Sequence, residues 1–292
     1  MSSKLTQTIN SLFGARDEFA LKASRENFPV ASRLLPREVR AHLMAIYGFA
    51  RLTDDIGDEA EGDRLALLDW LDDELELAST GRAIHPVFRR LTPVIEDSHL
   101  SLEPFRNLIE ANRVDQRVTR YQTFDDLVGY CMLSAAPVGR LVLDVFKVAT
   151  PERVAWSDDV CIALQLVEHL QDVSEDVQRD RIYLPVSDMK EFDCTEDDLR
   201  ASMANAAVRG VVAKEVRRAR ALLSAGRPLA ASLPGRARLA VSGFVAGGLA
   251  AADSIERANY DVLAIACRPT TRGVIAHTVS QLATASRHRS AA

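Results

Sequence analysis

Cysteine, proline and glycine are all scarce in this chain of 292 residues, and each scarcity excludes a class of protein. The 4 cysteines are scattered without a Cys-x-x-Cys pair, so neither a disulfide framework nor a structural zinc site is expected. The 11 prolines and 14 glycines stand far apart, and no Ser/Gly-rich linker divides the chain. Because 47% of the residues are hydrophobic, the chain can bury a large core and is neither collagen-like nor disordered.

A charge of one sign and long apolar runs are also missing. The 36 basic and 41 acidic side chains give a formal net charge of -5, which argues against a nucleic-acid partner. No uninterrupted run reaches the ~18 apolar residues of a spanning helix, and the N-terminal residues lack the apolar core of a signal peptide. We therefore expect a cytoplasmic protein. Arginine clusters at 217–220 and 236–238 leave open a peripheral contact with the inner face of a membrane, although surface arginines are common without any partner.

The chain does contain hydrophobic periodicity of about 3.6 residues, without a strand pattern or an internal repeat. It predicts an all-α fold, with a single domain over residues 1–286 and a disordered tail over 287–292. Capping residues such as Thr123 with Asp126, and Thr195 with Asp198, mark helix N-termini. The predicted helices cover residues 4–13, 37–57, 62–79, 85–98, 102–117, 124–148, 151–177, 195–202, 205–226, 232–265 and 271–286.

Two of these helices, 124–148 and 151–177, are apolar on more than one face, which places them centrally. Pro137 lies inside the first, among small residues. It is expected to kink the helix, because proline cannot donate a backbone hydrogen bond. Two interpretations are open: a tolerated kink packed by another helix, or a bent helix lining a cavity for an elongated apolar ligand.

An acidic pair interrupts an otherwise apolar helix at Asp54 and Asp58. This spacing puts both carboxylates on one face, with Cβ atoms about 6 Å apart. The helix C-terminus disfavours negative charge, so the pair is unfavourable unless a cation joins it. Magnesium typically binds one or two carboxylates together with substrate phosphates. Taken alone, the pair is either a solvated acidic helix end or part of a metal site.

A second acidic series lies in a segment that otherwise looks buried. Acidic residues recur at every fourth position, at Glu168, Asp172, Asp176 and Asp180. Two acidic series on core helices predict facing clusters across a shared cavity, which would hold a diphosphate through several metal ions. His169 is rotated about 100° from Glu168 around the helix and is interpreted as a packed core histidine rather than a base.

These segments resemble the squalene/phytoene synthase family over about residues 20 to 265. The resemblance is carried by Asp54-Asp55-Ile-Gly-Asp58, by Asp172-Val-Ser-Glu175-Asp176 followed by Arg181-Ile-Tyr183-Leu-Pro, and by Tyr130-Cys131 and Val138-Gly139. It implies an all-α, class I prenyl-synthase-like helical bundle around a central apolar cavity. It also implies Mg2+, with two or three ions bound together with the diphosphate of a prenyl substrate.

The resemblance also implies the site residues. Metal binding is implied at Asp54, Asp58, Asp172 and Asp176, which form the catalytic set together with Tyr130 and Arg181. Substrate contacts are implied at Phe28, Tyr47, Arg51, Gln165, Glu168, Tyr183 and Tyr260. Glu168 stands where many family members carry asparagine, and it could bind metal, hold a water or pair with an arginine. Arg51 and Arg181 would either neutralise the leaving diphosphate or simply balance the carboxylates.

Finer features are similar to the hydroxysqualene synthases of bacterial hopanoid pathways. They are Glu26-Asn27-Phe28, Ser134-Ala-Ala-Pro137-Val-Gly139 and Gln171. This resemblance implies conversion of presqualene diphosphate and water to hydroxysqualene and diphosphate, without NADPH, and other enzymes of that pathway as partners. The alternatives are condensation of two farnesyl diphosphates to presqualene diphosphate, a phytoene or dehydrosqualene synthase, or a non-catalytic scaffold relative.

Overall fold

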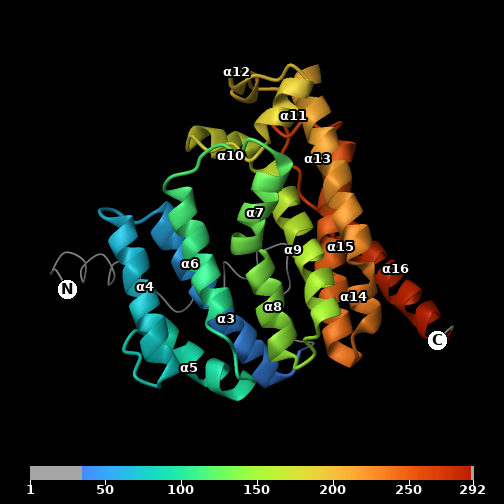
Figure 1. The fold of residues 1–292 in the computed structure, drawn as a ribbon. Helices are drawn as coiled ribbons and strands as arrows, with labels where there is room; N and C mark the ends of the chain where they lie inside the picture. The colour runs from blue at the N-terminus through green and yellow to red at the C-terminus, as the bar shows by residue number, and fades with distance from the viewer. Residues whose placement is uncertain (1–34, 291–292) are drawn as a thin grey trace. The chain divides into compact units, whose positions relative to one another are not determined.

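The structure, a computed structural model, describes residues 35–290, with side chains described as far as Ala283. Within that range the chain forms helices and loops, and its one β-type contact is an isolated parallel bridge between Arg120 and Ile182 (Figure 1). The predicted all-α class is confirmed. The helices are α3 (Arg37–Asp58), α4 (Arg64–Ser79), α5 (Pro86–Ser98), α6 (Glu103–Asp115), α7 (Phe124–Ser134), α8 (Ala136–Val145), α9 (Pro151–Gln171), α10 (Val173–Gln178), α11 (Val186–Glu191), α12 (Glu196–Leu199), α13 (Ala206–Ala225), α14 (Arg227–Ser232), α15 (Gly235–Arg257) and α16 (Thr271–Ser290).

Most predicted helices are present, and the differences lie at their ends. The helix predicted over 4–13 falls outside the described residues. The predicted helices 124–148 and 151–177 are each divided in two, and the helix predicted over 232–265 already ends at Arg257. The short helices α11 and α14 were not predicted, and α16 continues to Ser290, past the predicted end at residue 286.

By its internal contacts the chain divides into two compact units, and the first, Met1–Arg117 with Arg140–Ala149, contains α3 to α6. Its core is aromatic. The ring centroid of Phe49 lies 5.6 Å from that of Phe88 and 5.1 Å from that of Phe105, both edge-to-face. Such ring pairs add to the stabilisation from buried area alone. They fix α3 against α5 and α6, and so position the helix end that carries the first aspartate pair.

The second unit contains Val118–Gly139 and the chain from Thr150 onward. Its central helix, α9, packs against α7, α13, α14 and α15. Helix α15 approaches α9 closely at Gly248, where an added Cβ atom would collide with Leu164. Because α9 is held on several sides, its C-terminal end is a firm support for the second aspartate motif. The single domain expected over residues 1–286 stays a prediction.

The kink predicted at Pro137 is instead a break between two helices, and its cause is visible in the backbone. Helix α7 ends at Ser134, where the amide of Ala135 still donates to the carbonyl of Cys131 at 2.9 Å. Pro137 cannot make the corresponding bond two residues later, and α8 starts afresh at Ala136. An added Cβ atom at Gly139 would collide with side chains of α9. At this glycine the bent segment is packed by another helix, as in the first of the two interpretations.

Two helical stretches, Phe124–Val145 and Gly235–Arg257, are long and apolar enough to cross a membrane by length and composition alone. Their most apolar windows are 56% and 67% buried within the structure. Core helices of soluble proteins pass the same test when they are mostly buried, so these two stretches are weak evidence for a membrane span.

Candidate functional site

The first aspartate pair lies at the C-terminal end of α3. Asp54 and Asp58 are one turn apart, and no basic residue lies in the last turn of this helix. Mutual repulsion and the helix dipole both disfavour the two charges there. The side chain of Asp54 is reached by solvent, yet the protein around it displaces enough water to raise its pKa to about 7. A nearby cation would relieve both penalties.

Asn112 of α6 supports this pair and was not predicted. The side chain of Asn112 is buried, and its Nδ2 lies 3.3 Å from Asp54 Oδ1 and 3.2 Å from the carbonyl of Leu108. This hydrogen bond opposes the rise in the pKa of Asp54. Gly57 lies directly against the amide, and an added Cβ atom would collide with Asn112 Oδ1. A glycine at position 57 of the aspartate motif was therefore the one sign in the sequence that another side chain packs closely against this helix.

The end of α3 is capped by a side chain from the next helix. The guanidinium nitrogens of Arg64 donate to the backbone oxygens of Gly57, Asp58 and Ala60 at 2.9–3.0 Å. Gln116 of α6 also donates to the Gly57 oxygen, at 3.0 Å. A cation at a helix C-terminus offsets the dipole that disfavours the aspartates. Both residues were missed, because neither belongs to the motif in sequence.

Arg51 lies one turn before the aspartate pair. Its Nη2 is 2.6 Å from Asp55 Oδ1 and 3.6 Å from Glu59 Oε1. The structure thus shows Arg51 balancing carboxylates, with Asp55 rather than Asp54 as its close ion-pair partner. Its role in substrate binding stays a prediction.

The second aspartate motif is built on a helix break. Helix α9 ends at Gln171, and the backbone oxygen of Asp172 accepts from the amides of Glu175 and Asp176 at 2.9 and 2.8 Å. Asp172 thereby turns the chain into α10, which carries Asp176. Burial raises the pKa of the Asp172 carboxyl, and the charge of Glu175 adds to the effect.

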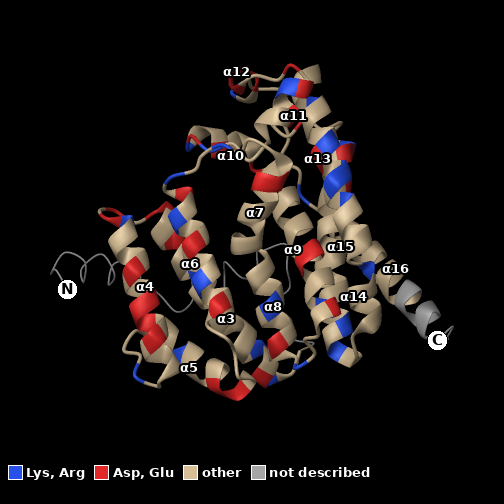
Figure 2. Ribbon diagram, in the orientation of Figure 1, with Lys and Arg blue, Asp and Glu red and all other residues tan. Residues whose placement is uncertain are grey.

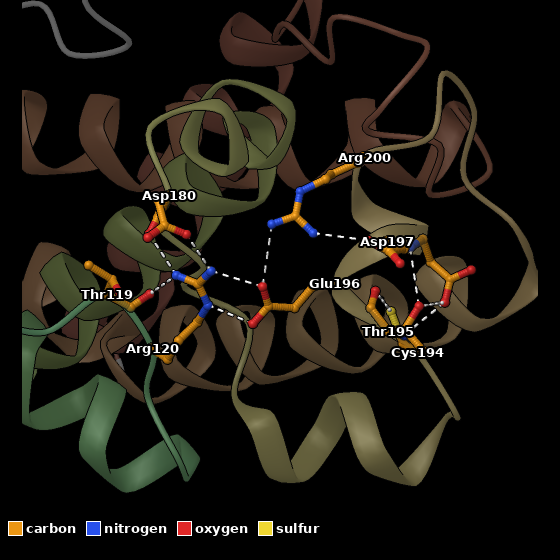
Figure 3. Close-up of polar contacts among 9 residues, drawn as sticks. Thr119, Arg120, Asp180, Cys194, Thr195, Glu196, Asp197 and Arg200 are labelled. Atoms are coloured by element: carbon orange, nitrogen blue, oxygen red, sulfur yellow. Dashed lines mark hydrogen bonds and ion pairs between the residues drawn. The ribbon is translucent and has the colours of Figure 1, made fainter.

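The predicted acidic stripe is wrong at Asp180. Helix α10 ends at Gln178, and Asp180 lies beyond it with a left-handed φ of 58°. Its carboxylate is bound by Arg120, at 2.7 Å from Nη2 (Figure 3). The helical period could not reveal this, because the helix breaks at Asp172 and ends before Asp180.

Three predicted residues of the second motif line one small hollow. Asp176, Arg181 and Tyr183 surround it together with His169, and the remaining lining is apolar. The backbone amide of Arg181 donates to the carbonyl of Asp176 at 2.9 Å, which fixes the turn between them. Residues that carry a carboxylate, a guanidinium and a phenol thus line one hollow.

Two rings of an aromatic cluster, those of His169 and Tyr183, line this hollow. The ring of His169 stacks on Tyr183, with centroids 3.7 Å apart and planes 10° apart. Tyr183 also contacts Tyr130 at 5.7 Å and Tyr121 at 5.8 Å between ring centroids. Burial lowers the pKa of His169 to about 3, so this ring is neutral near pH 7. His169 is packed as predicted, but against a predicted site residue.

The other predicted substrate contacts are placed individually. Gln165 Nε2 lies 3.3 Å from His169 Nε2, so Gln165 belongs beside the aromatic cluster. Glu168 on α9 and Tyr47 on α3 are half-buried. Tyr260 follows α15 in a left-handed conformation with φ 59°, beyond the helix in which it was expected. Phe28 lies outside the described residues. All of these roles stay predictions.

The arginine clusters considered for membrane contact are largely engaged within the protein. Figure 2 shows basic and acidic residues side by side along α13. Arg218 pairs with Asp188, and Arg220 Nη2 lies 2.5 Å from Asp253 Oδ1. Arg238 is buried and donates to the backbone of the loop before α15. These three arginines make ion pairs or hydrogen bonds within the protein. The membrane contact itself stays a prediction.

The donor set fits magnesium. The four predicted ligands are all carboxylates, and hard oxygen donors are the ligands that Mg2+ prefers. The acidic pair at the end of α3 has no basic residue in its own last turn. Asp54 and Asp58 would hold metal in one unit, and Asp172 and Asp176 in the other.

The fold and the two aspartate motifs define an all-α prenyl synthase, and comparison with known proteins identifies the family. The model of the squalene/phytoene synthase family matches residues 21–274. A hydroxysqualene synthase of Zymomonas mobilis is 36% identical over 214 residues, covering 71% of each chain. A phytoene synthase of Arthrospira platensis is 33% identical over 252 residues, covering 81% of this chain and 82% of the relative.

Solved structures agree. A squalene synthase from Alicyclobacillus acidocaldarius superposes with a TM-score of 0.77 at 41% identity, covering 89% of this chain and 97% of that one. A dehydrosqualene synthase superposes with a TM-score of 0.82 at 21% identity, which shows the shared fold. The chain belongs to the squalene/phytoene synthase family and is an enzyme of isoprenoid biosynthesis, a family that acts on prenyl diphosphates.

Proposed function

We propose that this enzyme converts presqualene diphosphate and water to hydroxysqualene and diphosphate. The reaction breaks the bond between carbon and the diphosphate oxygen, rearranges the cyclopropylcarbinyl cation, and forms a new carbon–oxygen bond to water with release of a proton. The observation that carries the proposal is the hollow where Asp176, Arg181 and Tyr183 meet, at the end of a buried helix. It combines groups for a diphosphate with an aromatic wall for a cation.

The choice of substrate is supported by the relatives. Hydroxysqualene synthases of Zymomonas mobilis and Rhodopseudomonas palustris are 36% and 35% identical to this chain. Phytoene synthases match at similar identity, such as 33% for that of Arthrospira platensis. The second candidate is therefore the head-to-head condensation of two prenyl diphosphates.

The residues have distinct parts in the proposed reaction. The guanidinium of Arg181 would bind the diphosphate oxygens and favour their departure. The rings of Tyr183, which lines the hollow, and of Tyr130, which contacts it, would stabilise positive charge on carbon while apolar neighbours exclude water. His169 is stacked on Tyr183 and holds its ring in place.

Magnesium, when bound, would supply positive charge that stabilises the leaving diphosphate. Asp54 and Asp58 of the first unit, and Asp172 and Asp176 of the second, would each hold metal. No reductant is required, because water rather than hydride ends the reaction.

The test is an assay of the purified protein with Mg2+ and no NADPH, run in parallel on presqualene and farnesyl diphosphate. We expect hydroxysqualene from presqualene diphosphate only, identified by mass spectrometry, and no change of product when NADPH is added. Asp54→Asn and Asp172→Asn should each lower kcat/KM by at least about 10²-fold, because each removes one charge that faces the metal.

Asp73→Asn is the matched control, because Asp73 is an exposed carboxylate on α4. It should leave kcat/KM within about twofold. Turnover of farnesyl diphosphate would instead support the second candidate, the condensation of two prenyl diphosphates. An unchanged presqualene diphosphate would contradict the proposal.

A further inference from the structure

Arg120 uses every hydrogen-bond donor that its side chain has. Its Nε and Nη2 bind the two carboxylate oxygens of Glu196 at 2.8 and 2.9 Å, and Nη2 also binds Asp180 Oδ1 at 2.7 Å (Figure 3). Its Nη1 donates to the backbone oxygens of Asp180 and Thr119, at 2.6 and 2.9 Å. A guanidinium has five N–H groups, and these five contacts use all of them.

The clamp formed by Arg120, Asp180 and Glu196 holds the chain just before the candidate diphosphate residues. Asp180 has a φ of 58°, a left-handed conformation that non-glycine residues adopt at a cost. Arg120 binds both the backbone and the carboxylate of this residue, so it stabilises that conformation directly. The next residue is Arg181, whose direction depends on how the chain leaves Asp180.

The same segment is fixed again two residues later. The amide of Ile182 donates to the carbonyl of Thr119 at 2.9 Å, beside the isolated bridge between Arg120 and Ile182. Tyr121, which follows Arg120, stacks on Tyr183 with planes 21° apart. Arg181 and Tyr183 are therefore flanked on both sides by contacts made from residues 119–121.

The carboxylates of the clamp are occupied by arginine and not by a ligand. The hydrogen bond from Arg120 lowers the pKa of Glu196, so Glu196 stays ionised near pH 7. Arg200 pairs with Glu196 from the exposed side, at 3.5 Å, and with Asp197 at 3.2 Å. Arg120, Asp180 and Glu196 thus form an ion-paired support beside the hollow, and the role of this clamp is positioning.

We propose that Arg120 is a positioning residue that sets Arg181 and Tyr183 for the diphosphate of the substrate. The inference rests on the proposed function, because it takes Arg181 as the group that meets the diphosphate. Lysine cannot replace Arg120, since an ammonium group has three donors and lacks the planar fork that spans Glu196 and Asp180. A misplacement of about 1 Å at a catalytic group can reduce the rate about 10²-fold.

A double-mutant cycle tests whether Arg120 acts through Arg181. Arg120→Gln should weaken binding of inorganic diphosphate with Mg2+, measured by calorimetry, and lower kcat/KM by about 10²-fold. In an Arg181→Gln background the same change should cost less than about threefold, because the group it positions is already gone. Arg117→Gln, at an exposed arginine three residues earlier in the chain, is the matched control and should stay within about threefold of the wild type.

The outcomes separate this inference from the proposed function. Equal losses in both backgrounds, or no effect of Arg120→Gln, would overturn it. So would a wild-type protein that does not bind diphosphate with Mg2+. A wild type that binds diphosphate but makes no hydroxysqualene contradicts the proposed function alone, and the cycle on binding still decides the role of Arg120. If Arg120→Gln does not fold by circular dichroism, Arg120→Lys and Arg181→Lys complete the same cycle, with a loss of at least about tenfold expected in the first.

Discussion

At the scale of single residues, Gly57 shows how one missing side chain organises the first aspartate pair. Asn112 occupies the space that a Cβ atom at this position would need, and from there it reaches Asp54. Gly57→Ala should push the amide away, lowering the free energy of unfolding by about 1–3 kcal/mol. It should also lower kcat/KM, since Asp54 loses its hydrogen bond. Thermal unfolding and steady-state kinetics measure the two effects.

Gly48→Ala is the control for this prediction, because it lies in the same helix with nothing within 4 Å of an added Cβ atom. The free energy of unfolding should rise by about 0.5–1 kcal/mol there, as alanine is the better helix former. Equal effects at the two glycines would contradict the role of Asn112.

The sequence predicted the charged residues of the site better than their supports. Asp54 and Asp58 were recognisable from their spacing on an apolar helix. Asn112 was not, because it is 58 residues from Asp54 and is an ordinary helical residue in its own segment. Arg120 was missed for the same reason: its partners Asp180 and Glu196 are brought to it only by the fold.

At the scale of helices, the end of α3 depends on Arg64 of the next helix. Arg64→Met removes three hydrogen bonds to carbonyls beside an acidic pair. We expect the free energy of unfolding to fall by about 1–2 kcal/mol and a higher Mg2+ concentration to be needed for half-maximal activity. Urea unfolding and a magnesium titration of activity test this.

Arg89→Met, at an exposed position of α5, is the control and should change the free energy of unfolding by less than about 0.5 kcal/mol. A change of the same size at Arg89 would mean that the effect is not one of capping.

Helices were predictable where a residue marks their ends, and less so elsewhere. Pro137 predicted an irregularity at the place where α7 and α8 are separated, although a kink rather than a break was expected. The capping boxes at Thr123 and Thr195 are present as predicted. The break at Asp172 has no proline or glycine near it. It arises because the backbone oxygen of Asp172 accepts the first hydrogen bonds of a new helix. The spacing of apolar residues in the sequence does not indicate such a change of hydrogen-bond partners.

At the scale of the whole molecule, stability should depend on pH through a histidine remote from the aspartates. His85 is 8% exposed and caps α5, with its ring edge-on to Trp70. Its backbone amide donates to the buried carboxylate of Glu74 at 3.2 Å. Burial lowers the pKa of His85 to about 4, with the charge of Arg90 adding to the effect.

The direction of the pH effect follows from the pH at which His85 becomes protonated in the folded and in the unfolded chain. Between about pH 6.5 and pH 4 the unfolded chain protonates His85 while the folded chain does not, so acid destabilises the fold through this group. His85→Asn keeps a side-chain acceptor for the helix end and cannot be protonated in this range. The wild type should therefore lose about 3 kcal/mol relative to H85N as the pH falls from 7 to 4, measured by urea unfolding at each pH. His99→Asn removes an exposed histidine from the other end of α5, where Asn suits the left-handed backbone, and should show no comparable change. If the free energies of unfolding of the wild type and of H85N change equally over this pH range, the folded protein does not keep the buried ring neutral.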